Sequence, residues 1–73
     1  METKNKFAER LKDLRSERNV GQIELAEKLQ VSRGIISLWE NGLREPTLSS
    51  LIRIATFFGV TLDYLAGLND YER

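Results

Sequence analysis

The sequence contains no cysteine and no histidine. Without cysteine, the chain can form neither a disulfide nor a thiolate metal site. Without histidine, it lacks the commonest general base and the commonest metal ligand in proteins. Composition therefore argues against hydrolytic, redox and zinc chemistry. The carboxylates that are present have no partner base, nucleophile or metal ligand beside them, so we expect no enzyme activity and no cofactor.

Long hydrophobic runs are also missing, and there is a single proline. No apolar stretch approaches the roughly 20 residues needed to span a bilayer, and residues 1–6 show no secretory pattern. Together with the absence of cysteine, this predicts a cytoplasmic protein with no membrane partner. A chain of 73 residues is expected to form one domain, 1–73, with little room for an enclosed pocket. No small-molecule ligand is therefore expected.

The chain has no excess of charge of one sign, because eleven basic and eleven acidic residues give a net charge of zero. Since phosphate contacts dominate affinity for nucleic acid, this balance counts against a nucleic-acid partner. The distribution is slightly uneven. Residues 1–33 hold eight basic and six acidic side chains, a net of +2, whereas residues 34–73 hold three and five, a net of −2. Charge alone does not indicate DNA binding.

Apolar residues recur at helical spacing, and nothing alternates with period two for long enough to form a strand. Ser32, Thr47 and Thr61 are suitable N-caps, and glycines follow three of the apolar segments. These residues predict that each helix begins at a Ser or Thr and ends at a Gly. The segment after Gly67 is expected to fray. The fold class is therefore all-α, with five helices expected at about residues 3–18, 22–29, 33–41, 48–58 and 62–66.

The most informative stretch is Gln22–Gly42, QIELAEKLQVSRGIISLWENG. It predicts an eight-residue helix, a three-residue turn and a second short helix. A turn this short forces the two helices to cross steeply. The second helix then projects its N-terminal part outward, where it can enter a DNA major groove about 12 Å wide. We call this second helix, predicted at 33–41, the recognition helix.

These motifs resemble the phage repressor and Cro group, the Xre-type helix-turn-helix family, over about Phe7 to Gly67. The resemblance implies a compact five-helix, lambda-repressor-like domain. It also implies a sequence-specific regulator of bacterial or phage origin, most often a repressor, that binds a palindromic double-stranded operator as a dimer. The matching motifs are QIELA at 22–26, VSR at 31–33, IS at 36–37, WENG at 39–42, Pro46, and GVTLDYL at 59–65.

The resemblance also implies which residues contact DNA. Arg33 is the best candidate base reader, because its planar guanidinium can bond O6 and N7 of guanine together. Gln22 opens its helix where free N–H groups suit a phosphate oxygen. Past the recognition helix, Asn41 and Arg44 are expected to contact the sugar-phosphate backbone. The full expected set is Gln22, Ser32, Arg33, Gly34, Ile35, Ser37, Leu38, Asn41 and Arg44, with Arg33, Gly34 and Leu38 at base-reading positions and Ile35 and Ser37 near the backbone or groove wall.

Two further expectations follow from the resemblance. Glu40 would repel phosphate, so we expect it to form an intramolecular ion pair with Arg15 that ties the first helix to the recognition helix. Dimerisation is expected through the region of the fourth and fifth helices. Some of these residues, Leu62 and Leu65 above all, could instead only close the core. The dimer candidates are Leu62, Tyr64, Leu65, Leu68 and Tyr71.

The chain departs from the family pattern at three places. Gln30 occupies a turn position where relatives usually have glycine, and a left-handed conformation there would cost roughly 1 kcal/mol. Gly34 lies in the recognition helix, where it either permits close approach to DNA or is neutral. Ile35 and Leu38 are apolar where small polar or basic residues are usual. They either meet thymine methyl groups or form part of a protein-binding surface.

An alternative function therefore remains open, in which the helix-turn-helix fold is a protein-interaction module, antitoxin-like or an anti-repressor partner, with weak DNA binding. The chain is either a complete minimal regulator or the DNA-binding part of a longer protein. The operator sequence, the regulated genes and the choice between repression and activation do not follow from the residues.

Overall fold

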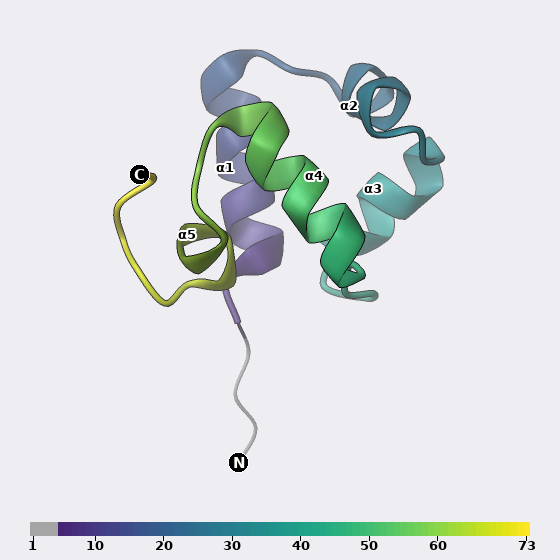
Figure 1. Ribbon diagram of the computed structural model, residues 1–73. Helices are drawn as coiled ribbons and strands as arrows, with labels where there is room; N and C mark the ends of the chain where they lie inside the picture. Colours follow the sequence, from purple (N-terminus) through teal and green to yellow (C-terminus); the bar gives the residue numbers. More distant parts are fainter. Residues whose placement is uncertain (1–4) are drawn as a thin grey trace.

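The computed structural model describes residues 5–73 and contains only helices and connecting segments in that range. The predicted all-α, five-helix class is confirmed. In Figure 1, α2 and α3 lie on one side of the molecule, α5 and the C-terminal segment lie on the other, and α1 and α4 lie between them. The helices are α1 (Phe7–Arg18), α2 (Gln22–Leu29), α3 (Arg33–Glu40), α4 (Leu48–Phe58) and α5 (Leu62–Ala66).

Two predicted boundaries are corrected. The first helix was expected from residue 3, but α1 begins at Phe7; residues 3 and 4 lie outside the described residues. Asn5 provides the start signal, since its Oδ1 accepts a hydrogen bond from the Phe7 backbone N–H at 3.0 Å. The Asn5 amide also donates to Glu45 Oε2 at 3.1 Å, which links this start to the loop before α4. At the other boundary, α3 ends at Glu40, one residue earlier than predicted.

The five helices end in the same way, and glycine is not the common element. In each case a backbone N–H just past the helix bonds back to the carbonyl five residues earlier, as in a Schellman closure. The residue before this donor is left-handed, and at two ends it is not glycine. The left-handed residues are Asn19, Gln30, Gly42, Gly59 and Gly67. The expectation of a Ser or Thr start and a Gly end therefore fails at α1 and α2.

A single hydrophobic core joins all five helices. Each helix buries an apolar stripe of side chains in this core. That burial is the main favourable contribution to the free energy of folding. Ile35 is half-buried and packs against this core. The core residues are Phe7, Leu11, Leu14, Leu25, Ala26, Leu29, Ile36, Trp39, Ile54, Ala55, Phe58, Val60, Tyr64 and Leu65.

Two expected dimer contacts are core residues instead. Leu65 is fully buried and Tyr64 is 7% exposed, so neither side chain presents a surface to a second subunit. The guanidinium of Arg10 lies over the Tyr64 ring at 4.1 Å from its centroid, which covers that ring from the α1 side. Of the five candidates, Leu62, Leu68 and Tyr71 remain on the surface, with exposed fractions of 38%, 80% and 74%.

The C-terminal segment, residues 68–73, is docked rather than frayed. Arg10 of α1 donates to the Asn69 carbonyl and to Asp70 Oδ1, at 3.2 and 2.9 Å. At the C-terminal end of α1, Arg18 donates to Glu72 Oε1 at 3.0 Å and to the Phe58 carbonyl at 2.7 Å. The Glu72 carbonyl in turn accepts from the Thr61 N–H at 2.8 Å. Two arginines of α1 thus hold the tail against the helices; we call this the arginine clasp.

No helix within residues 5–73 combines the length and the apolar character required to cross a bilayer.

The left-handed residue at the α2 end generates a stability prediction. Gln30 has φ of 59° and ψ of 43°, a left-handed conformation that is strained for residues other than glycine. Gln30→Gly should therefore stabilise the protein by up to about 1 kcal/mol, a rise in melting temperature of roughly 4–8 °C for a domain of this size. Thermal and urea unfolding followed by circular dichroism would measure it.

Asn19→Gly is the matched control, because Asn19 has nearly the same φ of 56°. Asparagine tolerates the left-handed region better than glutamine, so its gain should be smaller. A loss of stability in Gln30→Gly would mean that the Gln30 side chain, which accepts from Arg53 at 3.5 Å, outweighs the backbone strain.

Candidate nucleic-acid interface

The turn between α2 and α3 is closed by backbone and side-chain hydrogen bonds together. Left-handed Gln30 directs the Val31 N–H back to the Ala26 carbonyl at 3.0 Å, which ends α2. Val31 packs against the core, and Ser32 then starts α3, since its Oγ accepts from the Ile35 N–H at 3.2 Å. These bonds satisfy part of the free backbone groups at the turn, and they define the geometry between the two helices.

Fewer residues of α3 are fully exposed to solvent than the sequence suggests. Its N-terminal corner is exposed, whereas later positions are partly covered because Ile36 and Trp39 bury the other side of this helix. Ile35 packs part of its side chain against the core, and this contact explains its apolar character without a DNA or protein partner. Among the predicted DNA contacts, the exposed ones are Ser32, Arg33, Gly34, Asn41 and Arg44, and the half-buried ones are Gln22, Ile35, Ser37 and Leu38.

Gly34 is not required by the packing of the protein. A Cβ built at this position would meet only Ser32 Oγ, at 3.8 Å, which is an ordinary contact. Its φ is not among the positive values either. Alanine would suit the helix better, by about 1 kcal/mol in a helix interior. The reason for glycine therefore lies either in what approaches α3 from outside or in no constraint at all.

The predicted ion pair between Arg15 and Glu40 is present, and it is bidentate. Arg15 Nε donates to Glu40 Oε2, and Arg15 Nη2 donates to Glu40 Oε1 at 2.9 Å. The Glu40 side chain is only 4% exposed, so its charge is costly to bury without a partner. These hydrogen bonds raise the pKa of the Arg15 guanidinium above its ordinary value, although burial opposes them. Arg15 therefore keeps its charge at every relevant pH.

The pair extends into a chain of hydrogen bonds that reaches the recognition helix. Gln22 Nε2 donates to Glu40 Oε1 at 3.1 Å, and Gln22 Oε1 accepts from Arg33 Nε at 3.4 Å. Sequence reasoning gave Gln22 and Arg33 separate roles, whereas the structure brings them together. The network runs from α1 through α3 and α2 to the exposed corner of α3, where the contact with Arg33 is its longest member.

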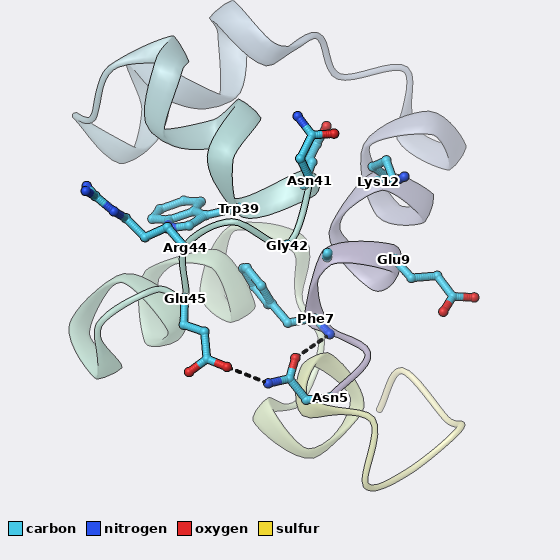
Figure 2. A pocket seen from close by; sticks show the side chains of 11 residues that line it. Asn5, Phe7, Glu9, Lys12, Trp39, Asn41, Gly42, Arg44 and Glu45 are labelled. Atoms are coloured by element: carbon cyan, nitrogen blue, oxygen red, sulfur yellow. Dashed lines mark hydrogen bonds between the residues drawn. The ribbon is translucent and has the colours of Figure 1, made fainter. Parts of the chain in front are cut away.

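A second cluster of polar groups surrounds a hollow of about 460 Å³ between α1 and the loop that follows α3. Figure 2 shows Asn41 and Lys12 on one side of this hollow and Arg44 on the other, with the Asn5–Glu45 hydrogen bond below. Within residues 5–73, neither Lys12 nor Arg44 takes part in an ion pair. Sequence analysis missed Lys12, because nothing in the α1 pattern distinguishes it from other surface lysines.

No group of three acidic side chains within the described residues is placed to hold a metal ion. The hollow offers Lys12, Asn41 and Arg44 as donors, and two exposed carboxylates, Glu9 and Glu45, line it as well. Such donors suit an anionic ligand with many oxygens, as the nucleic-acid backbone is.

Comparison with known proteins agrees with this geometry. The helix-turn-helix family matches residues 11–65, and the chain belongs to this family, in its Xre/Cro-type branch. The five-helix arrangement is that of the repressor DNA-binding domains.

Among curated relatives, the transcriptional activator BcrR of Enterococcus faecalis is 49% identical over 59 residues, which cover 81% of this chain and 29% of BcrR. A transcriptional regulator from Listeria innocua superimposes with a TM-score of 0.84 at 32% identity, covering 89% of this chain and 61% of that one. The P22 c2 repressor bound to a synthetic operator gives 0.79 at 29% identity, covering 84% and 94%.

The region matched by this chain makes up only 29%, 51% and 53% of the lengths of three curated relatives, so the chain spans about half or less of each of them. The three proteins described above are named as a transcriptional activator, a transcriptional regulator and a repressor in complex with a synthetic operator.

The buried carboxylate generates a second prediction. Arg15→Ala leaves Glu40 charged and buried with only Gln22 as a side-chain donor, so it should destabilise the protein by about 3–5 kcal/mol. Urea denaturation would measure the loss. The control is Arg18→Ala, which removes an ion pair with side chains 37% and 34% exposed and a hydrogen bond to the Phe58 carbonyl, and should cost less, about 1–2 kcal/mol. Equal effects of the two substitutions would contradict the special role of the buried pair.

Proposed function

We propose that this chain is a sequence-specific double-stranded DNA-binding transcription regulator, a repressor of the phage or mobile-element type, with α3 in the major groove. The observation that carries the proposal is the exposed corner of α3, where Arg33 and Gly34 lie free of the core while Gln22 contacts the arginine. The similarity to a P22 repressor bound to its operator supports the same docking. Such a regulator acts on the chromosome, so its location is the cytoplasm.

Base reading falls to Arg33, Gly34 and Leu38. The exposed Arg33 guanidinium, 3.4 Å from Gln22 Oε1 through its Nε, can bond the O6 and N7 edges of guanine. The missing side chain at Gly34 lets the helix approach the bases closely. Leu38 offers a half-buried apolar surface to a thymine methyl group. With Ile35 accounted for by the core, Leu38 is the one apolar reader in this set.

Phosphate positioning falls to the start of α2 and to the hollow. The helices α3, α4 and α5 satisfy a first-turn N–H with a Ser or Thr side chain, but the N-cap of α2 is Gly21, with no side-chain cap. Its first-turn N–H groups therefore have no side-chain acceptor, which leaves them available for a phosphate oxygen beside Gln22. Lys12, Asn41 and Arg44 would contact the neighbouring stretch of backbone.

A dimer is proposed because one recognition helix reads only a few base pairs. Leu62 of α5 and Leu68 and Tyr71 of the C-terminal segment are exposed apolar side chains. Figure 1 shows α5 and this segment on the side of the molecule away from α3. Two of them stand on the tail that the arginine clasp holds in place. A two-fold dimer through this surface would set two recognition helices about 34 Å apart, on successive major grooves of a palindromic operator.

Fluorescence anisotropy with random duplex DNA at 50 and 200 mM salt tests the proposal. Because phosphate contacts release counterions, affinity should fall by about 10–100-fold between the two conditions. Absence of binding at 50 mM would reject a DNA-binding function. Selection from a randomised duplex pool should then return an inverted repeat with half-sites about 10 base pairs apart, whereas a single half-site would reject the dimer.

Substitutions separate base reading from phosphate positioning. Arg33→Ala should remove the preference at one base position, a loss of about 1–3 kcal/mol there. Arg44→Ala and Lys12→Ala should instead weaken all sequences about equally and lower the salt dependence by about one phosphate contact each. Arg73→Ala, an exposed cation at the end of the tail, is the control and should leave binding unchanged. Uniform weakening by Arg33→Ala would assign that residue to the backbone.

A further inference from the structure

A shallow groove separates the C-terminal end of α2 from the middle of α4, with a volume of about 290 Å³. It takes no part in the DNA contacts proposed above. Gln22, at the other end of α2, is seven residues from Leu29, which corresponds to about 10 Å along the helix axis. The residues lining the groove are Lys28, Leu29, Ile52, Arg53, Thr56 and Phe57.

The floor and walls of this groove are apolar. Leu29 is a core residue that closes the bottom, while Ile52 and Phe57 remain 46% and 37% exposed on α4. The Thr56 hydroxyl donates to the Ile52 carbonyl at 2.8 Å, so its polar atom is already used within the helix. One turn before Ile52, Leu48 continues the row and is also exposed. Exposed apolar surface flanked by polar groups is typical of a binding surface.

The rim of the groove is positively charged. Lys28 stands on the α2 side and Arg53 on the α4 side, and no carboxylate is among the lining residues. Within residues 5–73 neither cation forms an ion pair. The contact from Arg53 Nη2 to Gln30 Oε1 is 3.5 Å, at the limit of a hydrogen bond. Both charges are therefore available to a ligand of opposite sign.

We propose that this groove binds an amphipathic helix of a partner protein, whose apolar side chains enter between Ile52 and Phe57 and whose acidic side chains meet Lys28 and Arg53. Helix-in-groove recognition uses apolar anchors three or four residues apart, which suits a row along one helix. The volume lies at or below the lower limit of about 300 Å³ for small-molecule sites, so it fits side chains. DNA is excluded as the occupant, since the apolar floor offers nothing to phosphate.

The proposal is independent of DNA binding, so its test uses the protein free of DNA. A display library of helical peptides with randomised surface positions would be selected on the 73-residue chain. We expect enriched sequences to combine apolar residues at i and i+3 or i+4 with Asp or Glu beside them. Amide chemical shift changes on adding the best peptide should centre on Leu29, Ile52 and Phe57.

Variants decide whether the groove is responsible. Lys28→Glu/Arg53→Glu should weaken the best peptide by about tenfold or more, because two attractive pairs become repulsive. Ile52→Asp should abolish its binding. Lys6→Glu/Arg73→Glu is the matched charge reversal at exposed positions outside the groove and should have little effect. Circular dichroism and an unchanged midpoint of urea unfolding establish that each variant is folded.

Three outcomes would overturn the proposal. Enriched peptides that are basic, or that bind both charge-reversal variants equally, would place recognition elsewhere. Self-association of the free protein that Ile52→Asp removes would make the groove a contact between two copies. A selection that enriches nothing over the Ile52→Asp variant would mean that the groove has no helical partner. Each result can be distinguished from a failure of DNA binding, which is measured separately by anisotropy.

Discussion

The arrangement of the molecule depends on one buried carboxylate. Glu40 lies at the end of α3 with almost no solvent contact, and its charge is tolerated only because Arg15 and Gln22 donate to it. These donors come from α1 and α2, so three helices meet at a single side chain. Apolar packing is not directional, whereas a bidentate pair has a defined geometry. The pair therefore fixes how α3 is rotated, and so which of its residues are exposed.

Hydrogen bonding through Gln22 extends from Glu40 to Arg33. The same residue thus serves the interior of the protein and its candidate reading surface. The net charge of the chain is zero, and the hollow that gathers Lys12, Asn41 and Arg44 is also lined by Glu9 and Glu45, so charge alone does not favour DNA there.

Local patterns predicted local features well. The caps at Ser32, Thr47 and Thr61 follow from neighbouring residues and are present, whereas a left-handed Gln30 was considered only through the family pattern. The Arg15–Glu40 pair, 25 residues apart, was anticipated only through family resemblance. The arginine clasp joins Arg10 to Asp70 across 60 residues, and no periodicity could indicate it.

Burial of Tyr64 was missed because it depends on Arg10, a charged residue from another helix that covers the ring. Lys12 was missed because its significance comes from the loop after α3, which folds back beside it. In each case a contact between distant segments gives a residue a role that its own neighbours in the sequence do not reveal.

Trp39 has a consequence of a different kind. It is the only tryptophan in the chain, it is nearly inaccessible to water, and it precedes Glu40 directly. Its ring meets Phe7 of α1 edge to face, with centroids 6.1 Å apart, and it lines the same hollow as Asn41 and Arg44. The molecule therefore carries its own optical probe at the junction of α1 and α3. Its intrinsic fluorescence reports on the polarity of that junction without any added label.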